Sequence, residues 1–265
     1  MMYLEELFPD TWCKLHHYAE MGLWELAAGK TVVDAGCGTG FYAMRLAQHA
    51  ANVMAVDLSE ANIAWCRDNI EGVDFRTGEI ERLPLPDSSV DLVFCAEVLE
   101  HVKDSRAVLV EMARILRPGA ALLLAFPIRP ALPTTRFLEW CSDALTNWYY
   151  GKTHPMAHQR VLHHTSVAAE IQGLGFSVTE IRRIQCTGVS LLEQSMAIAG
   201  KLLTGLSRRS RLYRTAQAEQ THWVKTRAAR AWSRCMTPLM RWLARKDSAF
   251  RGFDSTCAVI LARKK

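Results

Sequence analysis

The sequence contains no long apolar run that is free of charge. The best candidate for a membrane span, residues 189–206, includes Glu193 and Lys201, whereas a spanning helix needs about 20 predominantly apolar residues. The N-terminal sequence MMYLEELFPD also lacks the basic start and continuous apolar stretch of a secretory signal. We therefore expect a cytoplasmic protein whose only contact with a membrane would be peripheral.

Paired cysteines are missing as well. The eight cysteines are scattered singly, with no Cys-x-x-Cys pair and no repeated spacing, so we expect free and mostly buried thiols.

The histidine cluster consists of His154, His158, His163 and His164. Because no cysteine or carboxylate stands near these histidines at ligand spacing, we expect no metal site.

Acidic residues are scarce in the second half of the chain. Residues 128–265 carry 22 Lys+Arg against 8 Asp+Glu, whereas residues 1–127 carry 10 against 19. A basic half of this kind suggests an acidic partner, a membrane surface or nucleic acid. A solvated helical face is the alternative interpretation.

The basic excess is concentrated in residues 201–246, which contain twelve Lys+Arg and a single acid, Glu219. If this segment is helical, its basic residues lie on one face of the helix and its apolar residues on the opposite face. Pro238 would interrupt this helix. The basic side holds Arg227, Arg230, Arg234, Arg241 and Arg245, and the apolar side holds Trp232, Met236, Leu239 and Leu243. This pattern predicts basic amphipathic helices that suit an anionic membrane or an acidic carrier protein. No recognition module supports nucleic acid.

Strand and helix patterns alternate through most of the remaining sequence. Short apolar runs rich in β-branched residues predict strands at 31–35, 52–56, 73–77, 90–95, 120–126, 176–184 and 256–263. Helical patterns fall between them at 39–49, 60–70, 105–116 and 165–173. Strands that are apolar throughout and separated by helices predict a parallel sheet covered on both faces.

The first predicted strand runs into a glycine-rich turn, VVDAGCGTGF at residues 32–41. A turn of this kind lets a ligand approach the main-chain N–H groups at the start of the next helix, and both dinucleotides and S-adenosylmethionine use it. The dinucleotide pattern lacks its third small residue, because Phe41 stands there, and no Gly-Lys-Ser/Thr follows as in a P-loop. The spacing of Gly36, Gly38 and Gly40 therefore disfavours both of these nucleotide sites.

Polar residues follow the next three strands where an open α/β sheet exposes its ligand crevice. Asp57 ends the second strand and suits the vicinal hydroxyls of a ribose. After the third strand, Glu79 is placed to accept from an exocyclic amine while the Ile80 N–H donates to a ring nitrogen. After the fourth strand, the segment CAEVLEHV brings Glu97, Glu100 and His101 to the same edge.

Residues 30–127 resemble the class I S-adenosylmethionine-dependent methyltransferases, in particular the small-molecule branch that includes the ubiquinone and menaquinone methyltransferases. The resemblance rests on VVDAGCGTG, VDLS, GEIERLPLPDSSVDLV, AEVLEHV and ARILRPGA in this order. Two departures are Glu79, where the family usually has Asp, and Gly119-Ala120, where it usually has Gly-Gly. The resemblance implies a Rossmann-like doubly wound α/β fold: a seven-stranded, mostly parallel sheet with an antiparallel C-terminal strand and a helical cap insertion.

The resemblance also implies roles for individual residues. Asp34 would help to hold the methionine end of the cofactor, Asp57 the ribose hydroxyls, and Leu58 and Ile80 would enclose the adenine. The full set of expected cofactor-binding residues is Asp34, Gly36, Cys37, Gly38, Gly40, Asp57, Leu58, Glu79, Ile80, Ala96 and Glu97. His101 is the expected catalytic base if the methyl acceptor is a hydroxyl.

We expect three parts in the chain: an N-terminal helical cap at 1–29, a cofactor-binding α/β core at 30–185 plus 253–265, and a basic helical insertion at 186–252. The expected function is transfer of a methyl group to a small or lipid-like acceptor, with oxygen as the favoured acceptor atom. Methylation at carbon and methyl esterification of a carrier-bound carboxyl are alternatives. A regulatory protein that binds S-adenosylmethionine without turnover is the alternative from another class.

Overall fold

The computed structural model describes residues 9–128, 162–186 and 255–265, together with the single positions 137, 238, 242, 245 and 246. By its internal contacts the chain divides into two compact units. The larger one, called the α/β unit below, comprises Tyr18–Ile128, His158–Arg183 and Cys257–Lys265. Nearly all of the predicted basic insertion lies outside the described residues, so the division into cap, core and insertion stays a prediction.

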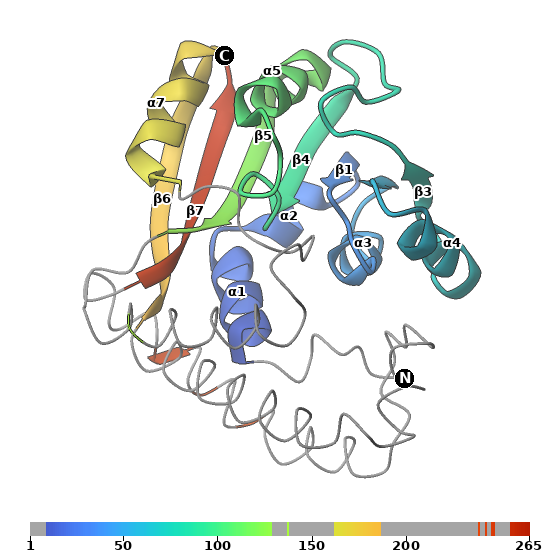
Figure 1. Cartoon of the computed structure of the whole chain (residues 1–265), viewed down its shortest axis with the longest axis horizontal. Helices are drawn as coiled ribbons and strands as arrows, with labels where there is room; N and C mark the ends of the chain where they lie inside the picture. Colours follow the sequence, from blue (N-terminus) through green and yellow to red (C-terminus); the bar gives the residue numbers. More distant parts are fainter. Residues whose placement is uncertain are drawn as a thin grey trace. The chain divides into compact units, whose positions relative to one another are not determined.

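Strands and helices alternate along the described chain, as Figure 1 shows. The strands are β1 (Thr31–Ala35), β2 (Asn52–Asp57), β3 (Asp74–Thr77), β4 (Val90–Ala96), β5 (Leu116–Pro127), β6 (Phe176–Cys186) and β7 (Ser255–Lys264). The helices are α1 (Pro9–Glu20), α2 (Leu23–Ala27), α3 (Phe41–Leu46), α4 (Glu60–Asn69), α5 (Ser105–Ile115) and α7 (His164–Gly173). All seven predicted strands and all four predicted helices are confirmed, although α3 is shorter than predicted at both ends.

The seven strands form one sheet in the order β3-β2-β1-β4-β5-β7-β6. Strands β1 to β5 pair in parallel, and β7 is antiparallel to β5. The chain moves outward from β1 to β3 and then returns to β4 on the other side of β1, which is the strand order of a doubly wound sheet. The predicted α/β class with an antiparallel C-terminal strand is therefore confirmed, whereas nearly all of the predicted helical cap insertion at 186–252 lies outside the described residues.

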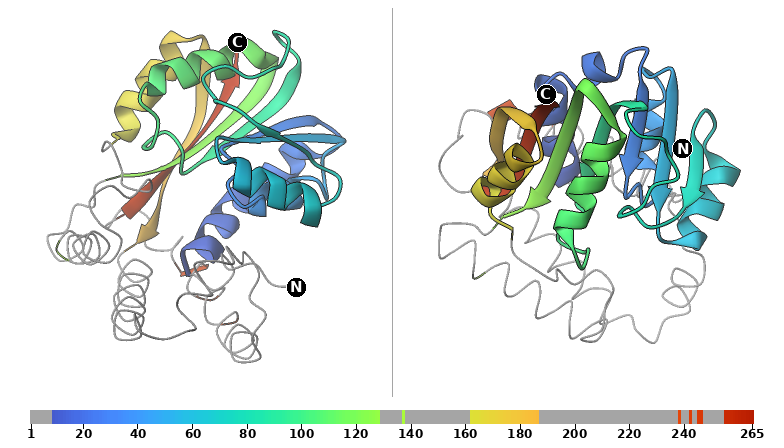
Figure 2. Two further views of the ribbon diagram at one scale, coloured as in Figure 1. Left: turned by 45° about the vertical axis from the view of Figure 1, so that its right-hand side comes forward. Right: turned by 90° about the horizontal axis from the view of Figure 1, so that it is seen from above.

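Helices cover both faces of this sheet. Parallel strands are joined by right-handed crossovers. From β1 to β3 the chain moves across the sheet in one direction, and from β4 to β5 it moves in the other. The connecting helices of these two halves therefore lie on opposite faces of the sheet. Helices α5 and α7 lie side by side in Figures 1 and 2, and the Arg106 Nη1 of α5 is 3.6 Å from the Glu170 Oε1 of α7. Within the described residues, no helix has the length and apolar character needed to cross a bilayer.

The core lies between the sheet and its helices. The central strands are almost completely buried: Val32 and Val33 of β1 are at most 1% exposed, and Leu122 and Leu124 of β5 are fully buried. Burying one such side chain contributes about 1.5–3 kcal/mol relative to leaving it exposed. Apolar side chains on both faces therefore hold the sheet in place and fix the positions of the strand ends.

The amino edge of the sheet, where the parallel strands begin, is closed by hydrogen bonds. The Asp91 carboxylate accepts from the Thr31 N–H at 3.0 Å and from the Arg117 guanidinium at 2.6 Å. The Lys264 Nζ donates to the Leu116 carbonyl at 2.7 Å. The predicted Pro118-Gly119 turn lies within β5 at this edge and interrupts the pairing of β5 with β4. Leu116 pairs with Val90, and after a register shift the pairing continues from Ala121, which pairs with Leu92.

Candidate functional site

The glycine turn joins the end of β1 to the start of α3. The N–H groups of Gly36 and Cys37 both donate to the Val56 carbonyl of β2, at 2.8 and 3.0 Å. Gly36, Gly38 and Gly40 have φ angles of 82°, 51° and 77°, which L residues with a side chain rarely adopt. The backbone of this turn therefore strongly favours glycine at all three positions.

Space around the three glycines differs, and the difference assigns each a separate role. A Cβ at Gly36 would lie 2.3 Å from Val98 Cγ2, and a Cβ at Gly40 would lie 2.6 Å from Ile70 Cδ1. A Cβ at Gly38 would meet no atom of the described residues within 4 Å. Gly36 and Gly40 thus admit neighbouring side chains, whereas the described residues leave open space at Gly38.

Asp57 stands at the end of β2, next to this open side. Its Oδ2 accepts from the Gly38 N–H at 2.8 Å and its Oδ1 accepts from the Ser59 N–H at 2.9 Å. The N-cap of α4 is Ser59, whose side chain accepts from the Asn62 N–H, so Asp57 is not needed for capping. Each carboxylate oxygen has a second lone pair, and Asp57 is therefore held in place with acceptor capacity for a pair of hydroxyl groups.

Asp34, the third residue of the motif, is 2% exposed. Burial raises its pKa from 3.8 to about 7, the nearby Asp57 carboxylate adds to the rise, and the Ala43 backbone N–H opposes it. Its Oδ2 has no hydrogen-bond partner among the described residues. A buried carboxyl oxygen of this kind is costly unless a partner arrives, and the ammonium group of an amino-acid ligand is a partner of the right charge.

The two residues expected to enclose an adenine differ in exposure. Leu58, directly after Asp57, is 72% exposed, which is unusual for a leucine at the end of a buried strand. Ile80 is 6% exposed and belongs to the hydrophobic core. The Glu79 side chain is exposed, and Gly78, one residue earlier, donates its N–H to the Asp57 carbonyl at 3.1 Å. The structure thus brings the segment that carries Glu79 and Ile80 next to Asp57.

Cys37 lies inside the glycine turn and is buried. Burial raises the pKa of its thiol, and Asp34 and Asp57 add to the effect. A neutral thiol is a small apolar group that neither binds metal nor acts as a nucleophile. Cys37 therefore packs within the turn, and any contact of this residue with a ligand would be through its backbone.

The segment after β4 forms the other side of the site. Glu97 has φ 59°, a left-handed conformation that is strained for a residue with a side chain, and its N–H donates to the Ala125 carbonyl at 2.8 Å. Ala96 is the last residue of β4 and pairs with Ala125. The strained turn at Glu97 redirects the chain, and it places Val98 against Gly36.

His101 and Glu100 end this segment. The His101 Nε2 lies 3.6 Å from the Glu100 Oε1, the His101 side chain is 30% exposed, and that of Glu100 is fully buried. Burial raises the pKa of the nearby Cys95 thiol, and Glu100 and Asp34 add to this rise. Two buried carboxyl groups thus lie close to Cys95, and His101 is the member of the group that reaches solvent.

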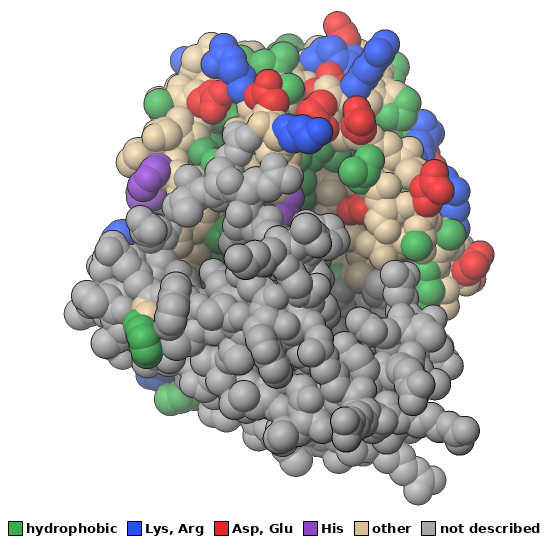
Figure 3. Space-filling model, in the orientation of Figure 1, with side chains coloured by type: hydrophobic (Ala, Val, Ile, Leu, Met, Phe, Trp, Pro, Cys, Tyr) green, Lys and Arg blue, Asp and Glu red, His purple; other side chains and the backbone are tan. Residues whose placement is uncertain are grey.

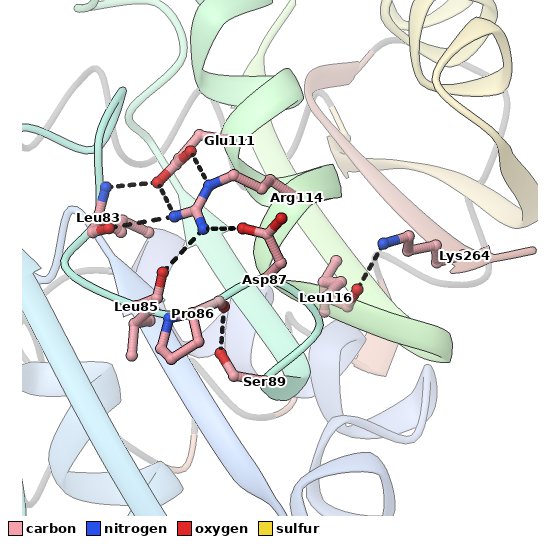
Figure 4. A network of polar contacts seen from close by, with 9 residues as sticks. All are labelled: Leu83, Leu85, Pro86, Asp87, Ser89, Glu111, Arg114, Leu116 and Lys264. Atoms are coloured by element: carbon pink, nitrogen blue, oxygen red, sulfur yellow. Dashed lines mark hydrogen bonds and ion pairs between the residues drawn. The ribbon is translucent and has the colours of Figure 1, made fainter.

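Sequence reasoning missed the contacts that hold the β3–β4 loop (residues 78–89). In Figure 4, Glu111 and Arg114 of α5 point toward the backbone of this loop. Glu111 Oε1 accepts from the Leu83 N–H at 2.6 Å, and the Arg114 guanidinium donates to the Leu85 carbonyl at 2.9 Å. The sequence offered one indication of these contacts, an acid and an arginine three residues apart on a predicted helix. Such pairs usually lie on the helix surface and interact with each other, so this spacing does not predict a contact with the loop.

The described surface that Figure 3 shows does not have the one-sided charge of the C-terminal half. Figure 3 shows acidic and basic side chains interspersed over the described part that faces the viewer. Among the described residues, no group of three or more His, Cys, Asp or Glu is arranged to hold a metal ion. His154 and His158 of the histidine cluster lie outside the described residues, as does nearly all of the basic segment 201–246.

Part of the chain is similar in sequence to known methyltransferases. Residues 33–124 match the family model described as a methyltransferase domain. A probable S-adenosylmethionine-dependent methyltransferase of Mycolicibacterium smegmatis is 39% identical over 118 residues, which are 44% of this chain and 46% of that protein. The malonyl-[acyl-carrier protein] O-methyltransferase of Serratia marcescens is 31% identical over 40% of this chain and 41% of its own length. The ubiquinone biosynthesis O-methyltransferase of Hahella chejuensis is 37% identical over 37% of this chain and 43% of its own length.

Solved structures show the same fold. A putative sarcosine dimethylglycine methyltransferase from Galdieria sulphuraria superposes with a TM-score of 0.59 at 13% identity, over 95% of this chain and 86% of that one. The chain spans less than half the length of the sequence relatives it matches. The residues that match the methyltransferase family model, 33–124, contain the glycine turn, Asp57 and the β3–β4 loop.

Proposed function

We propose, on the premise that residues 33–124 are a class I S-adenosylmethionine-dependent methyltransferase domain, that this protein methylates an oxygen atom of a small or lipid-like acceptor. The observation that carries the cofactor assignment is the pair formed by Asp57 and the open side of Gly38, joined by a hydrogen bond of 2.8 Å. A carboxylate fixed beside an open backbone turn provides the acceptor and the close approach that an adenosine ribose needs.

The residues present fit the cofactor along its length. Asp34, whose buried Oδ2 has no hydrogen-bond partner within the described part of the chain, would attract the ammonium of the methionine part. Asp57 would accept from the ribose hydroxyls. The exposed Leu58 side chain would cover one face of the adenine, and Glu79 would accept from its amine. For Ile80, whose side chain packs in the core, the backbone N–H is the group offered to the base.

S-adenosylmethionine, when bound, supplies a methyl group already activated by the attached sulfonium. The chain therefore chiefly has to hold the acceptor in line and exclude water, and positioning of this kind contributes about 7–11 kcal/mol in well-oriented systems. His101, the partly exposed group beside the buried Glu100, would accept the proton of an acceptor hydroxyl. Base assistance of this kind typically contributes ~100-fold or more in rate.

Oxygen as the acceptor atom is supported by two relatives that are named O-methyltransferases, one of ubiquinone biosynthesis and one acting on malonyl-[acyl-carrier protein]. The second also supports the alternative that the acceptor is a carrier-bound carboxyl. A carboxylate acceptor is already ionised and needs no base, so His101→Gln separates the two. Loss of about 100-fold in kcat with unchanged cofactor affinity favours an acceptor that must lose a proton, a hydroxyl or a carbon, and an unchanged kcat favours a carboxylate.

The test of cofactor binding is calorimetric titration with S-adenosylhomocysteine and with NAD. Binding of the first and not the second is expected, because Phe41 occupies the position where the dinucleotide turn needs a small residue. Binding of NAD alone would overturn the proposal.

Turnover is tested by comparing metabolites with and without the active protein for pairs that differ by one methylene. Binding without any such pair would favour the regulatory alternative.

The basic segment 201–246 is proposed to hold the enzyme on an anionic membrane or on an acidic carrier protein. Its support is the charge balance of twelve Lys+Arg to one acid, and each basic residue near a lipid surface contributes about 1 kcal/mol. Reversal of Arg230, Arg234 and Arg241 to Glu should abolish sedimentation with anionic vesicles and leave S-adenosylhomocysteine binding unchanged. If the wild type does not sediment at low salt, the membrane proposal is wrong.

A further inference from the structure

The geometry points to Glu111 and Arg114 as positioning residues for the cofactor. Both residues lie on α5 and would not touch the cofactor themselves. They hold the β3–β4 loop in the conformation in which Glu79 and Ile80 bind the adenine. This inference rests on the proposed function, because it assigns the adenine to Glu79 and Ile80. The loop has few regular contacts of its own, since residues 78–89 contain neither a helix nor a strand. Its shape must therefore be set by the groups that surround it.

The contacts from α5 reach the loop at successive points. Glu111 Oε1 accepts from the Leu83 N–H at 2.6 Å. Arg114 donates to the carbonyl oxygens of Leu83 and Leu85 at 3.2 and 2.9 Å and to the Asp87 carboxylate at 2.5 Å. Figure 4 shows that these bonds converge on one guanidinium group, so a single planar fork fixes the second half of the loop at Leu83, Leu85 and Asp87.

Glu111 and Arg114 also hold each other. The Arg114 Nε and Nη2 donate to the two carboxylate oxygens of Glu111 at 2.8 and 2.7 Å, which is the bidentate geometry. Glu111 is buried, whereas Asp87 is 77% exposed, so the pair with Glu111 is the strong one and the pair with Asp87 is weak. The Arg114 guanidinium accordingly holds the pKa of Glu111 below its ordinary value.

The opposite end of the loop is attached to the ribose site. The Gly78 N–H donates to the Asp57 carbonyl at 3.1 Å, and the side chains of Ile80 and Leu83 are buried in the core at 6% and 3% exposure. Glu79 and Ile80 thus lie between an anchor at Asp57 and an anchor at Glu111. Loosening the second anchor leaves the ribose contact in place and lets the adenine contacts move.

The experiment compares two ligands on one variant and its matched control. Arg114→Lys keeps the charge but replaces the planar fork with a compact ammonium that cannot make all of these bonds. Calorimetric titration measures the dissociation constants of S-adenosylhomocysteine and of S-inosylhomocysteine, which has an oxygen in place of the adenine amine. The matched control is Arg117→Lys, which weakens an arginine–aspartate pair of 2.6 Å at the amino edge of the same sheet.

We expect Arg114→Lys to weaken S-adenosylhomocysteine binding about tenfold, a loss of about 1.4 kcal/mol, and to weaken the inosine analogue much less. The preference for adenine over hypoxanthine should therefore fall in Arg114→Lys and stay within about twofold of wild type in Arg117→Lys. A merely structural role would lower the affinity for both ligands equally. Should Arg114→Lys fail to fold, Glu111→Gln, which keeps an oxygen acceptor for the Leu83 N–H, takes its place.

An unchanged adenine preference in a folded Arg114→Lys or Glu111→Gln protein overturns the inference while leaving the proposed function intact. If the wild type binds S-adenosylhomocysteine but does not prefer it to the inosine analogue, the loop does not read the amine, and the inference is wrong at that step. If the wild type binds neither ligand, the proposed function itself fails. The wild-type titrations therefore separate failure of the function from failure of the positioning role.

Discussion

The two edges of the central sheet differ in how completely their polar groups are paired. At the amino edge, Asp91 is bound by both the Thr31 N–H and Arg117, and Lys264 donates to the Leu116 carbonyl. At the carboxyl edge, the Asp34 Oδ2 is buried with no hydrogen-bond partner among the described residues. The backbone turn at Gly38 is open on one side at the same edge.

The difference separates polar groups that stabilise the fold from those that serve a ligand. Native proteins pair nearly all of their buried polar groups, so a buried carboxyl oxygen with no partner among the described residues, as at Asp34, suits a ligand that supplies one. The strongest disruption of ligand binding is therefore expected from changes at the carboxyl edge. Changes at the amino edge are expected to alter only stability.

The glycine turn gives the largest expected effect. Gly36→Ala places a Cβ 2.3 Å from Val98 Cγ2 at φ +82°, and overpacking costs about 1–3 kcal/mol with about 1–3 more for the strained backbone. The melting temperature should fall by about 2–4 °C per kcal/mol. Gly38→Ala has the same backbone problem but no clash, so it should melt higher than Gly36→Ala and still lose cofactor binding. Equal melting temperatures for the two variants would contradict these separate roles.

Asp57→Ala removes the proposed ribose acceptor. A hydrogen bond to a charged group contributes about 1.5–3 kcal/mol, so the dissociation constant for S-adenosylhomocysteine should rise about 10- to 150-fold. Water can replace the carboxylate at the partly exposed N–H groups of Gly38 and Ser59, and melting without ligand should change little. A folded variant with wild-type affinity would show that the ribose lies elsewhere.

Asp34 predicts a pH dependence with a defined sign. Its pKa in the folded protein is about 7 and its ordinary value is 3.8, so the folded state binds the proton more tightly. The stability from this proton is fully present below 3.8 and is lost as the pH rises to about 7. The melting temperature of the ligand-free protein should therefore fall over this range more in the wild type than in Asp34→Asn.

Ligand binding should show the opposite trend at the same residue. An ammonium placed beside Asp34 favours the ionised carboxylate, so the affinity for S-adenosylhomocysteine should rise as the pH increases to about 7. Asp34→Asn should remove this rise and release no proton on binding. Titration in two buffers of different ionisation enthalpy measures the proton directly, and an identical heat in both buffers at pH 6 would contradict the assignment.

The smallest effect is expected at the amino edge. Arg117 and Asp91 are 44% and 26% exposed, and an ion pair of this exposure contributes about 0.2–1 kcal/mol. Arg117→Ala should therefore lower the melting temperature slightly and leave the dissociation constant for S-adenosylhomocysteine unchanged. A clear loss of affinity in this variant would mean that the two edges are not independent.

The sequence predicted the strands and helices because apolar periodicity and turn residues act over short distances. The alternation from Thr31 to Phe126 is local information, and so is the order of motifs that indicated the cofactor. The separate roles of the glycines were not predictable in the same way. Val98 lies against Gly36 and Ile70 lies against Gly40 only in the folded chain. No sequence pattern near the turn predicts either of these two contacts.

The same limit applies to the adenine site. Leu58 and Ile80 have equal apolar character in the sequence, yet one is 72% and the other 6% exposed, because only the side chain of Ile80, a residue of the β3–β4 loop, packs in the core. The hydrogen bond from Leu83 to Glu111 joins residues 28 positions apart. Glu111 and Arg114 are three residues apart on α5, which allows them to pair with each other, but the loop that they hold depends on the packing of that helix against the sheet.

The exposed Leu58 side chain has a thermodynamic consequence. Covering an apolar surface on binding lowers the heat capacity of the complex relative to its free components. If the adenine lies on Leu58, the enthalpy of S-adenosylhomocysteine binding should become more negative as the temperature rises. Leu58→Ser removes most of that apolar surface, so the slope of binding enthalpy against temperature should become shallower in this variant even where its affinity at one temperature changes only modestly.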